Sequence, residues 1–396
     1  MRTDLVDRVR DRLVNGGDAV TPARVAEAIR TETGGLVGHA DLLAAMRQLR
    51  QEFVGFGPLE PLLRAPGTTD VLVTSPGEVW VDGTAGLRRT DVCFADEAAV
   101  RRLASRLALA AGRRLDDAQP FVDGWLPGGE FGTIRLHAVL PPIAADGTCL
   151  SLRVLQPTAH DLDALHVLGT FDTELAQILD AIVGARLAFL VTGATGSGKS
   201  TLLAALLARV PGRERVVCVE DAGELRPAHP QFVRLIARQA NVEGAGEVGL
   251  RALVRQALRM RPDRLVVGEV RGPEVIELLN ALNTGHDGGA GTLHANSPEE
   301  VPARLEALAA LGGLRRDALH SQLTAAVRIV LHMRRRADGI RRLAEIGVVS
   351  AEQGRAQVRP VWRDQPGDGQ PRWTVERSLL DDLLRAARAA DRGATC

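Results

Sequence analysis

Gly193-Ala-Thr-Gly-Ser-Gly-Lys-Ser200 fits the pattern G-x-x-x-x-G-K-[ST]. The apolar run 187–192 precedes it and the Leu- and Ala-rich run 200–209 follows it, so the loop is predicted to join a buried strand to a helix. Glycines let backbone N–H groups close around an anion, and the N-terminus of the following helix adds partial positive charge. A Gly-rich turn that fits the pattern by chance is the disfavoured alternative, because a strand-like run precedes the motif and a helix-like run follows it. The sequence therefore predicts a phosphate-binding loop, or P-loop, in an α/β fold.

Lys199 is the only lysine in a chain with 49 Lys and Arg residues. Arginine replaces lysine at most surface sites, but not where a compact ammonium must fit between phosphates. The pattern predicts that Lys199 bridges the β- and γ-phosphates of ATP and that the Ser200 hydroxyl binds Mg²⁺. The predicted ATP-binding residues are Gly193, Ala194, Thr195, Gly196, Ser197, Gly198, Lys199, Ser200 and Thr201.

The composition bounds the class of protein. A chain of 396 residues predicts roughly two or three domains. The formal net charge is zero and 3% of residues are aromatic, with no tyrosine, and both features argue against direct nucleic-acid binding. The cysteines, at positions 93, 149, 218 and 396, have no metal-type spacing. This favours a reducing compartment without a zinc site.

The hydropathy pattern contains no export or membrane signal. Residues 1–13 lack the apolar core of a signal peptide. No apolar run approaches the roughly 18 residues that a membrane span needs. We therefore expect a cytoplasmic protein without an integral membrane segment, and peripheral attachment to a membrane stays open.

Five parts are expected along the chain. Residues 1–54 are predicted as helices, 55–156 as a smaller α+β domain and 157–171 as a linker. Residues 172–350 alternate strand-like and helical patterns, which predicts a mostly parallel sheet with helices on its faces. Residues 351–396 lose this pattern and are predicted as a C-terminal tail with one last helix over 375–390.

Short apolar runs mark the expected strands. The first domain has them at 70–74, 78–82, 132–140 and 148–155, with a helix over 97–111. The second domain has them at 187–192, 215–220, 263–268, 291–294 and 328–333. Asp338-Gly339 then predicts a hairpin. Its flanking arginines, at 334–336 and 341–342, could bind a neighbouring subunit, lipid headgroups or nucleic acid, or simply be solvated.

Acidic residues end two of these strands. The apolar run 264–269 closes with Glu269, and in a parallel sheet such a strand end lies beside the P-loop. Gly268 stands where an Asp–Glu pair would have its Asp, so Glu269 alone is predicted to orient the attacking water; a salt-bridged surface glutamate is the alternative. Glu220-Asp221 ends another strand and suits Mg²⁺-bound water, with a helix cap as the open alternative.

A Gly-rich loop over 284–294 carries His286 and His294. Histidines in such a loop could sense phosphate or orient a catalytic acid. An ordinary loop histidine is an equal alternative for His294 on these residues alone. No ligand set completes a metal site there.

Four motifs in order resemble the type II/type IV secretion ATPase family, the hexameric motors of secretion, pilus assembly and conjugation. The sequence 193–201 matches the family's Walker A motif, 219–225 its Asp box, 258–272 its Walker B region and 284–297 its His box. Earlier stretches, at 55–63, 70–73, 119–123 and 135–142, resemble the family's N-terminal domain and point to its tight-adherence, CpaF-like branch. The resemblance spans roughly residues 50–350.

The resemblance implies a RecA-like P-loop ATPase domain preceded by a PAS-like α+β domain. It implies that Glu269 is the Walker B catalytic acid and that Glu220 is the acid of the Asp box, with Mg²⁺ contact through water. His294, and less directly His286, would contact the γ-phosphate. Arg271 is a further catalytic candidate.

The family also places arginines of its N-terminal domain at the nucleotide. Arg135 and Arg153 stand in the matching stretches and are predicted for this role, ordinary surface arginines being the alternative. The implied partners are other copies of the chain in a homo-hexamer and an inner-membrane platform protein at the cytoplasmic face.

These inferences favour a motor ATPase that couples ATP hydrolysis to domain movement. The alternative is a DNA translocase or conjugal DNA-transfer ATPase that acts directly on nucleic acid. A ring subunit that binds ATP without hydrolysis is disfavoured by the intact set of Lys199, Ser200 and Glu269.

Overall fold

A computed structural model describes residues 27–28, 31–32, 55–83, 86–127, 132–155, 161–238, 240, 245–336, 338–364 and 372–393. The chain forms two compact units, residues 1–156 and 157–396, each of which is described by itself. Residues 27–28 and 31–32 are helical, and the rest of the predicted helical segment 1–54 lies outside the described residues. None of the described helices combines the length and the apolar character that a bilayer crossing requires.

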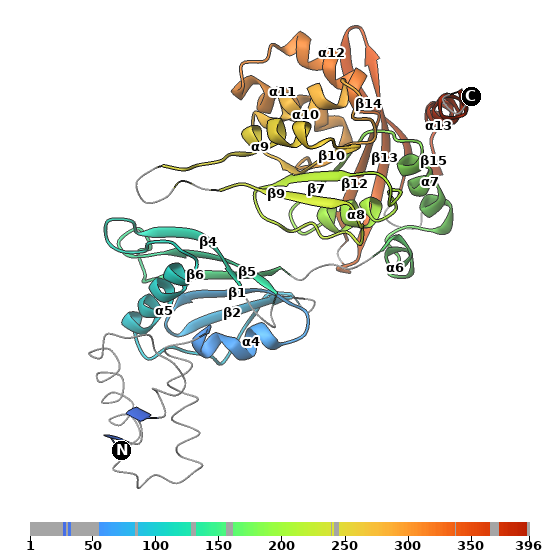
Figure 1. The fold of residues 1–396 in the computed structure, drawn as a ribbon. Coiled ribbons are helices and arrows are strands. Elements are labelled where there is room, and N and C mark those ends of the chain that lie inside the picture. The colour runs from blue at the N-terminus through green and yellow to red at the C-terminus, as the bar shows by residue number, and fades with distance from the viewer. Residues whose placement is uncertain are drawn as a thin grey trace. The chain divides into compact units, whose positions relative to one another are not determined.

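The first unit contains an antiparallel sheet in the order β3-β2-β1-β6-β5-β4 (Figure 1). Its strands are β1 (Thr68–Ser75), β2 (Glu78–Gly83), β3 (Arg88–Arg89), β4 (Phe121–Pro127), β5 (Thr133–Val139) and β6 (Cys149–Leu155). The short helices η1 (Gly57–Leu59) and α4 (Glu60–Arg64) precede β1. The strands predicted at 70–74, 78–82, 132–140 and 148–155 are confirmed.

Helix α5 (Glu97–Ala110) packs against β4, β5 and β6. It begins where the Asp96 side chain accepts a hydrogen bond from the N–H of Ala99, 2.7 Å away, and so caps the first turn. Val100, Leu103 and Leu107 recur three and four residues apart and are buried against the sheet. Strand β4 was not predicted, because Gly124 interrupts its apolar pattern. A Cβ at Gly124 would lie 2.9 Å from the Cβ of Ala111, so the glycine lets the end of α5 approach the strand.

The second unit is built on a nine-stranded sheet in the order β15-β14-β13-β12-β7-β11-β10-β8-β9 (Figure 1). From β12 to β9 all neighbouring strands are parallel, and β13, β14 and β15 extend the sheet in antiparallel fashion. The strands are β7 (Phe189–Gly193), β8 (Val216–Glu220), β9 (Phe232–Ile236), β10 (Arg264–Val270), β11 (Ala290–Leu293), β12 (Ile329–Arg335), β13 (Arg341–Glu352), β14 (Arg355–Arg363) and β15 (Arg372–Trp373).

Helices cover both faces of this sheet. One face packs against α6 (Leu162–Val167), α7 (Thr173–Gly184), α8 (Lys199–Leu207) and α13 (Arg377–Gly393). The other packs against α9 (Leu250–Ala257), α10 (Glu274–Leu282), α11 (Val301–Leu311) and α12 (Arg316–Ala326), and the short turns η3 (Leu258–Met260) and η4 (Pro298–Glu300) follow α9 and precede α11. Because β7 and β8 are covered on both faces, every residue in them is buried. The chain is thus an α/β protein with two sheets.

Three features of the second unit differ from the prediction, the first being β9, which no predicted strand covers. Residues 351–396 were expected to form a tail, yet β14 pairs with β13 along its length and is an integral part of the sheet. Gln353 and Gly354, with φ of 49° and 76°, form the tight turn between these strands. Two-residue hairpin turns usually have the sequence Asn-Gly or Asp-Gly. Because Gln-Gly stands here instead, the sequence did not predict this hairpin. The expected linker 157–171 contains α6, while 156–160 lie outside the described residues.

Candidate active site

The P-loop follows β7 at the carboxyl edge of the sheet. Gly193, Gly196 and Gly198 have φ of 141°, 73° and 96°, which other residues rarely adopt. A Cβ at Gly193 would lie 2.3 Å from the carbonyl oxygen of Met333 on β12, so no larger residue fits there. Helix α8 begins directly after Gly198. The loop therefore presents backbone N–H groups and a helix N-terminus to the same side, as an anion site requires.

Lys199 lies beneath this loop and is 7% exposed. Its Nζ donates to the carbonyl oxygens of Gly193 and Ala194, both 2.9 Å away. Burial lowers the pKa of Lys199, and nearby Glu269 opposes this effect. The ammonium thus bonds to the loop's own carbonyls, and phosphate oxygens are acceptors that could replace them.

The hydroxyl residues of the loop differ in exposure. Thr195 is exposed at the crest, whereas Ser197 is 1% exposed and its Oγ has no hydrogen-bond partner among the described residues. Ser200 lies in the first turn of α8 beside Lys199 and is half-buried. Within the described ranges no three His, Cys, Asp or Glu side chains cluster as a metal site. Mg²⁺ beside a triphosphate needs no such cluster, because phosphate oxygens, water and one or two protein oxygens suffice, so this donor set fits the ion.

Glu269 and His294 meet next to the P-loop. β11 pairs with β7 so that Leu293 is opposite Thr192, which places His294 beside Gly193. His294 Nε2 lies 2.5 Å from Oε1 of Glu269, and its Nδ1 lies 3.4 Å from Nζ of Lys199. Because the ammonium can only donate, this pattern assigns the ring proton to Nε2, the nitrogen that faces the Glu269 carboxylate. Burial and the charge of Lys199 lower the pKa of His294, which favours this neutral form.

Arg271 completes the row of polar side chains. Its guanidinium pairs with Oε2 of Glu269, and its Nη1 lies 4.0 Å from Oδ2 of Asp221 at the end of β8. Lys199, His294, Glu269 and Arg271 therefore form one continuous chain of contacts. The predicted catalytic residues at the ends of β10 and β11 are brought together with the P-loop lysine.

Glu220 ends β8, one strand further along, and is 3% exposed. Its Oε1 accepts a hydrogen bond from the N–H of Leu225 at 3.0 Å, while Oε2 has no partner among the described residues. Burial raises the pKa of Glu220 to about 7. A Cβ at Gly268 would lie 2.5 Å from Cγ of Glu220. The absence of an Asp at position 268 thus has a physical reason, since the Glu220 side chain fills that space.

Of the other predicted residues, His286 lies elsewhere in the second unit, and Arg135 and Arg153 belong to the first unit. His286 bonds through Nδ1 to the carbonyl of Pro262, 3.1 Å away and just before β10, so it lies at the amino edge of the sheet. Arg135 donates to both carboxylate oxygens of Asp123 at 2.9 and 2.8 Å, and Arg153 donates to Asp70 at 2.8 Å. Both arginines are thus neutralised within the sheet of the first unit, where they face each other across β5 and β6.

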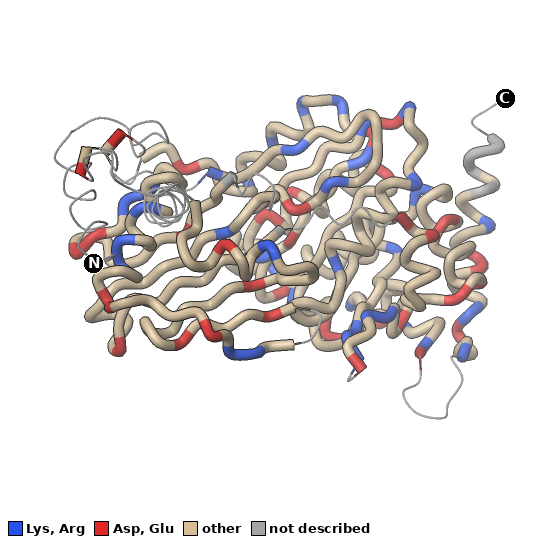
Figure 2. Tube along the Cα trace, turned by 90° about the horizontal axis from the view of Figure 1, so that it is seen from below, with Lys and Arg blue, Asp and Glu red and all other residues tan. Residues whose placement is uncertain are grey.

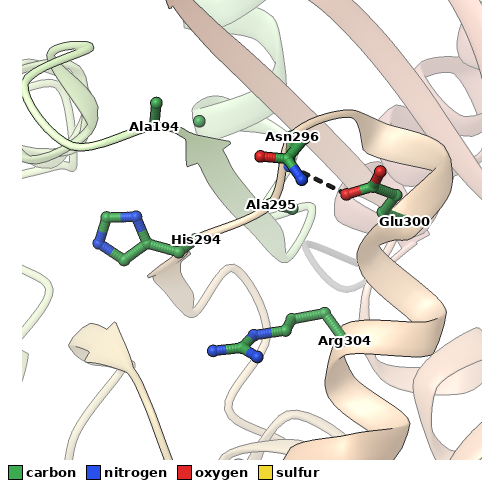
Figure 3. Close-up of a pocket in the computed structure, with 7 residues that line it drawn as sticks. Ala194, His294, Ala295, Asn296, Glu300 and Arg304 are labelled. Atoms are coloured by element: carbon green, nitrogen blue, oxygen red, sulfur yellow. Dashed lines mark hydrogen bonds between the residues drawn. The ribbon is translucent and has the colours of Figure 1, made fainter.

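Two arginines lie beside the P-loop, a position that sequence reasoning did not predict for them. Arg341 of the β12–β13 hairpin donates from Nε to the carbonyl oxygen of Gly196 at 3.0 Å and packs its stem against Gly198. Arg304 of α11 lines a pocket together with P-loop and His-box residues. Figure 3 shows His294 and Arg304 extending to the same side of this pocket, while the N–H of Asn296 bonds to Glu300 at 3.2 Å. Arg341 was predicted only as part of the basic cluster of the hairpin, and no motif marks Arg304.

Comparison with known proteins connects this site to a family. A family model described as type II/IV secretion system protein matches residues 52–362. A Mycobacterium tuberculosis (strain H37Rv) protein, provisionally named for conjugal transfer, is 61% identical over 357 residues, which cover 90% of this chain and 100% of that protein. The type IV secretion system protein PtlH of Bordetella pertussis is 33% identical over 271 residues, 62% of this chain and 78% of that protein.

Among solved structures, the Yersinia pseudotuberculosis ATPase DotB matches with a TM-score of 0.51 at 17% identity, over 70% of this chain and 75% of that chain. This likeness shows the fold alone. The family model, in contrast, spans well over half of the sequence and includes the P-loop, Glu269 and His294. The chain belongs to the type II/IV secretion system protein family.

Proposed function

We propose that this protein hydrolyses ATP to ADP and orthophosphate and thereby drives a secretion, pilus-assembly or conjugation apparatus. The observation that carries the proposal is the chain of contacts from Lys199 through His294 to Glu269 and Arg271 beside the P-loop. A phosphate-binding loop alone only binds nucleotide. A carboxylate held next to the lysine adds the group that orients a nucleophile.

Each residue then has a distinct task. The backbone N–H groups of 193–201 hold the phosphates, and Lys199 exchanges the loop carbonyls for β- and γ-phosphate oxygens. Glu269 accepts a hydrogen bond from the attacking water, and the contact with His294 fixes the orientation of the Glu269 carboxylate. Ser200, and Glu220 through water, would hold Mg²⁺, which neutralises charge on the β- and γ-oxygens when bound. Arg135 and Arg153 stay candidates for contact with the nucleotide on the resemblance alone.

The proposed assembly is a homo-hexamer of two-domain subunits at the cytoplasmic face of a membrane. Closure and opening of a domain around the nucleotide is a common way to turn hydrolysis into movement. The RecA-like and PAS-like descriptions of the two units belong to this proposal, as does the tight-adherence branch. The partner would be an inner-membrane platform protein that receives the movement.

A conjugal DNA-transfer ATPase is the second candidate, because the 61% identical relative carries a conjugal-transfer name. Acidic and basic residues are interspersed over the described parts of the chain (Figure 2), and the net charge is zero. These features disfavour direct gripping of DNA. Strong stimulation of ATP turnover by DNA, with steep salt dependence, would favour this candidate over a protein-coupled motor.

The decisive experiment measures ATP turnover and nucleotide affinity in matched variants. Glu269→Gln should keep ATP affinity within about twofold and reduce turnover by about 100-fold or more, since only the proton-accepting carboxylate is lost. Lys199→Ala should lose ATP affinity. Glu352→Gln, an exposed change at the end of β13, is the control and should behave as wild type. Wild-type turnover in Glu269→Gln would remove this residue from the mechanism, and normal binding by Lys199→Ala would refute the proposal.

A further inference from the structure

The pocket beside the P-loop is lined in part by residues that have no role in the proposed hydrolysis. It is lined by Gly193, Ala194, His294, Ala295, Asn296, Glu300 and Arg304. The first two residues carry the carbonyls that hold Lys199. Arg304 enters from α11, across the pocket from the P-loop (Figure 3). Arg304 therefore lines the pocket directly, and Lys199 bonds to the backbone of two other lining residues, Gly193 and Ala194.

Arg304 differs from three other arginines on this face of the second unit, which are ion-paired. Arg251 and Arg255 pair with Glu277, and Arg316 pairs with Glu306. Arg304 makes no hydrogen bond or ion pair with any of the residues that the structure describes. Of the two nearby acids on this segment, Glu300 accepts the N–H of Asn296, and Glu306 pairs with Arg316. The exposed Arg304 side chain thus lines the pocket without a protein acceptor among the described residues.

The charges around His294 indicate what kind of ligand this pocket would bind. Three cations, Lys199, Arg271 and Arg304, act on this ring against the Glu269 carboxylate, and one further carboxylate, Glu300, lines the pocket. Such an excess of positive charge fits an anion of more than one negative charge, and a terminal phosphoryl group carries about two near neutral pH. A guanidinium offers two parallel N–H donors, which match two phosphoryl oxygens.

We propose that Arg304 binds the terminal phosphoryl group of a nucleoside triphosphate from the side opposite Lys199, so that the pocket distinguishes a triphosphate from a diphosphate. The inference rests on the proposed function, because it requires the P-loop to hold the nucleotide. It also gives α11 a role. Leu305 and Leu308, which follow Arg304, belong to the apolar core beneath the sheet, so a pull on Arg304 acts on a packed helix.

The test compares the affinities of two nucleotides with Mg²⁺ in full-length protein: a non-hydrolysable ATP analogue and ADP. Arg304→Gln should weaken binding of the analogue about 10-fold or more while ADP affinity stays within about twofold. Arg304→Lys keeps the positive charge but loses the two parallel N–H donors of the guanidinium, so its affinity for the analogue should fall between those of wild type and Arg304→Gln. Arg315→Gln, an exposed arginine just beyond the far end of α11, is the matched control and should equal wild type. Thermal unfolding of each variant checks that the fold is intact.

The outcomes separate this inference from the proposed function. Equal losses for both nucleotides, or no loss for either, in a folded Arg304→Gln variant would overturn the role of Arg304. Failure of the wild-type protein to bind either nucleotide would instead overturn the proposed function. Selective loss of the triphosphate analogue supports both.

Discussion

The two flanks of the P-loop are built in different ways. On one side lie the carboxyl ends of β11, β10 and β8, which carry His294, Glu269 and Glu220; we term this the acid flank. On the other side lies the β12–β13 hairpin with Met333 and Arg341; we term this the hairpin flank. The acid flank consists of ionisable groups that bond to one another. The hairpin flank instead contacts the backbone of the loop.

We therefore expect the acid flank to determine the reaction chemistry and the hairpin flank to determine the conformation of the P-loop. Changes on the acid flank should alter how the protein treats the bond between the β- and γ-phosphates, and how its stability responds to pH. Changes on the hairpin flank should alter the form of the loop, and therefore the binding of triphosphate and diphosphate alike. Three variants test this division.

The largest effect is expected for Gly193→Ala, where the P-loop meets the hairpin flank. The new Cβ would lie 2.3 Å from the carbonyl oxygen of Met333 and 2.7 Å from Oγ of Ser197, at a φ of 141°. Both the clash and the strained backbone act against folding, so we expect a loss of stability of about 3–5 kcal/mol and no nucleotide binding. Chemical denaturation and nucleotide titration measure these effects.

Gly339→Ala in the hairpin turn is the control for Gly193→Ala. Its φ is 84°, yet a Cβ there would meet nothing within 4 Å. It should therefore cost only about 1 kcal/mol, from backbone strain alone. Equal stability losses in the two variants would mean that the close packing of the hairpin flank against Gly193 is not a constraint.

The acid flank could be predicted from the sequence for a physical reason. Its residues follow apolar runs directly, and parallel strands bring their carboxyl ends to one edge. The position of Glu269 and His294 beside Lys199 therefore needs only local patterns and one rule of topology. What stayed hidden was the role of Gly268, because the space that Glu220 fills there depends on packing between β8 and β10.

The hairpin flank could not be predicted in the same way. Its arginines were expected to face a subunit, a lipid, a nucleic acid or water, yet Arg341 contacts a loop 145 residues earlier in the chain. Arg336 pairs with Asp364, within the stretch expected to be a tail. Contacts between such distant segments follow from the order of strands in the finished sheet, which no local pattern encodes. Arg304 was missed for the same reason.

Glu220→Gln tests the acid flank through the pH dependence of stability. The native pKa is about 7 against an ordinary value of 4.5, so the folded protein holds this proton more tightly than the unfolded chain. Stability from this group is fully present below pH 4.5 and is lost as the pH rises to about 7. The gap corresponds to about 3 kcal/mol as an upper figure. Glutamine cannot ionise and keeps an oxygen for the N–H of Leu225, so the variant should avoid this loss.

The measurement is chemical denaturation of nucleotide-free protein at pH 4.5, 6 and 8. The variant should match wild type at the lowest pH and exceed its stability increasingly above it. Glu352→Gln, which is exposed, should follow wild type at every pH. If the free energy of unfolding changed with pH in the same way for wild type and Glu220→Gln, the raised pKa of the buried Glu220 carboxyl would be contradicted.

The smallest effect, and the sharpest test of the two flanks, is expected for Arg341→Ala. The change removes one hydrogen bond to Gly196 and the stem that packs on Gly198. A lost hydrogen bond of this kind is worth about 1 kcal/mol, so affinity should fall roughly fivefold. Because the contact is with the loop and not with the terminal phosphoryl group, ADP and a non-hydrolysable ATP analogue should weaken equally.

Arg335→Ala is the matched control for this last variant. Arg335 stands opposite Arg341 in the β12–β13 ladder and is exposed, but it makes no side-chain hydrogen bond or ion pair within the described part of the chain. It should leave both affinities unchanged, whereas a general effect of positive charge near the phosphates would weaken binding in both variants. Selective loss of the ATP analogue in Arg341→Ala, as expected for Arg304→Gln, would erase the distinction between the flanks. Equal loss of both nucleotides would assign loop shape to the hairpin and recognition of the terminal phosphoryl group to the acid flank and α11.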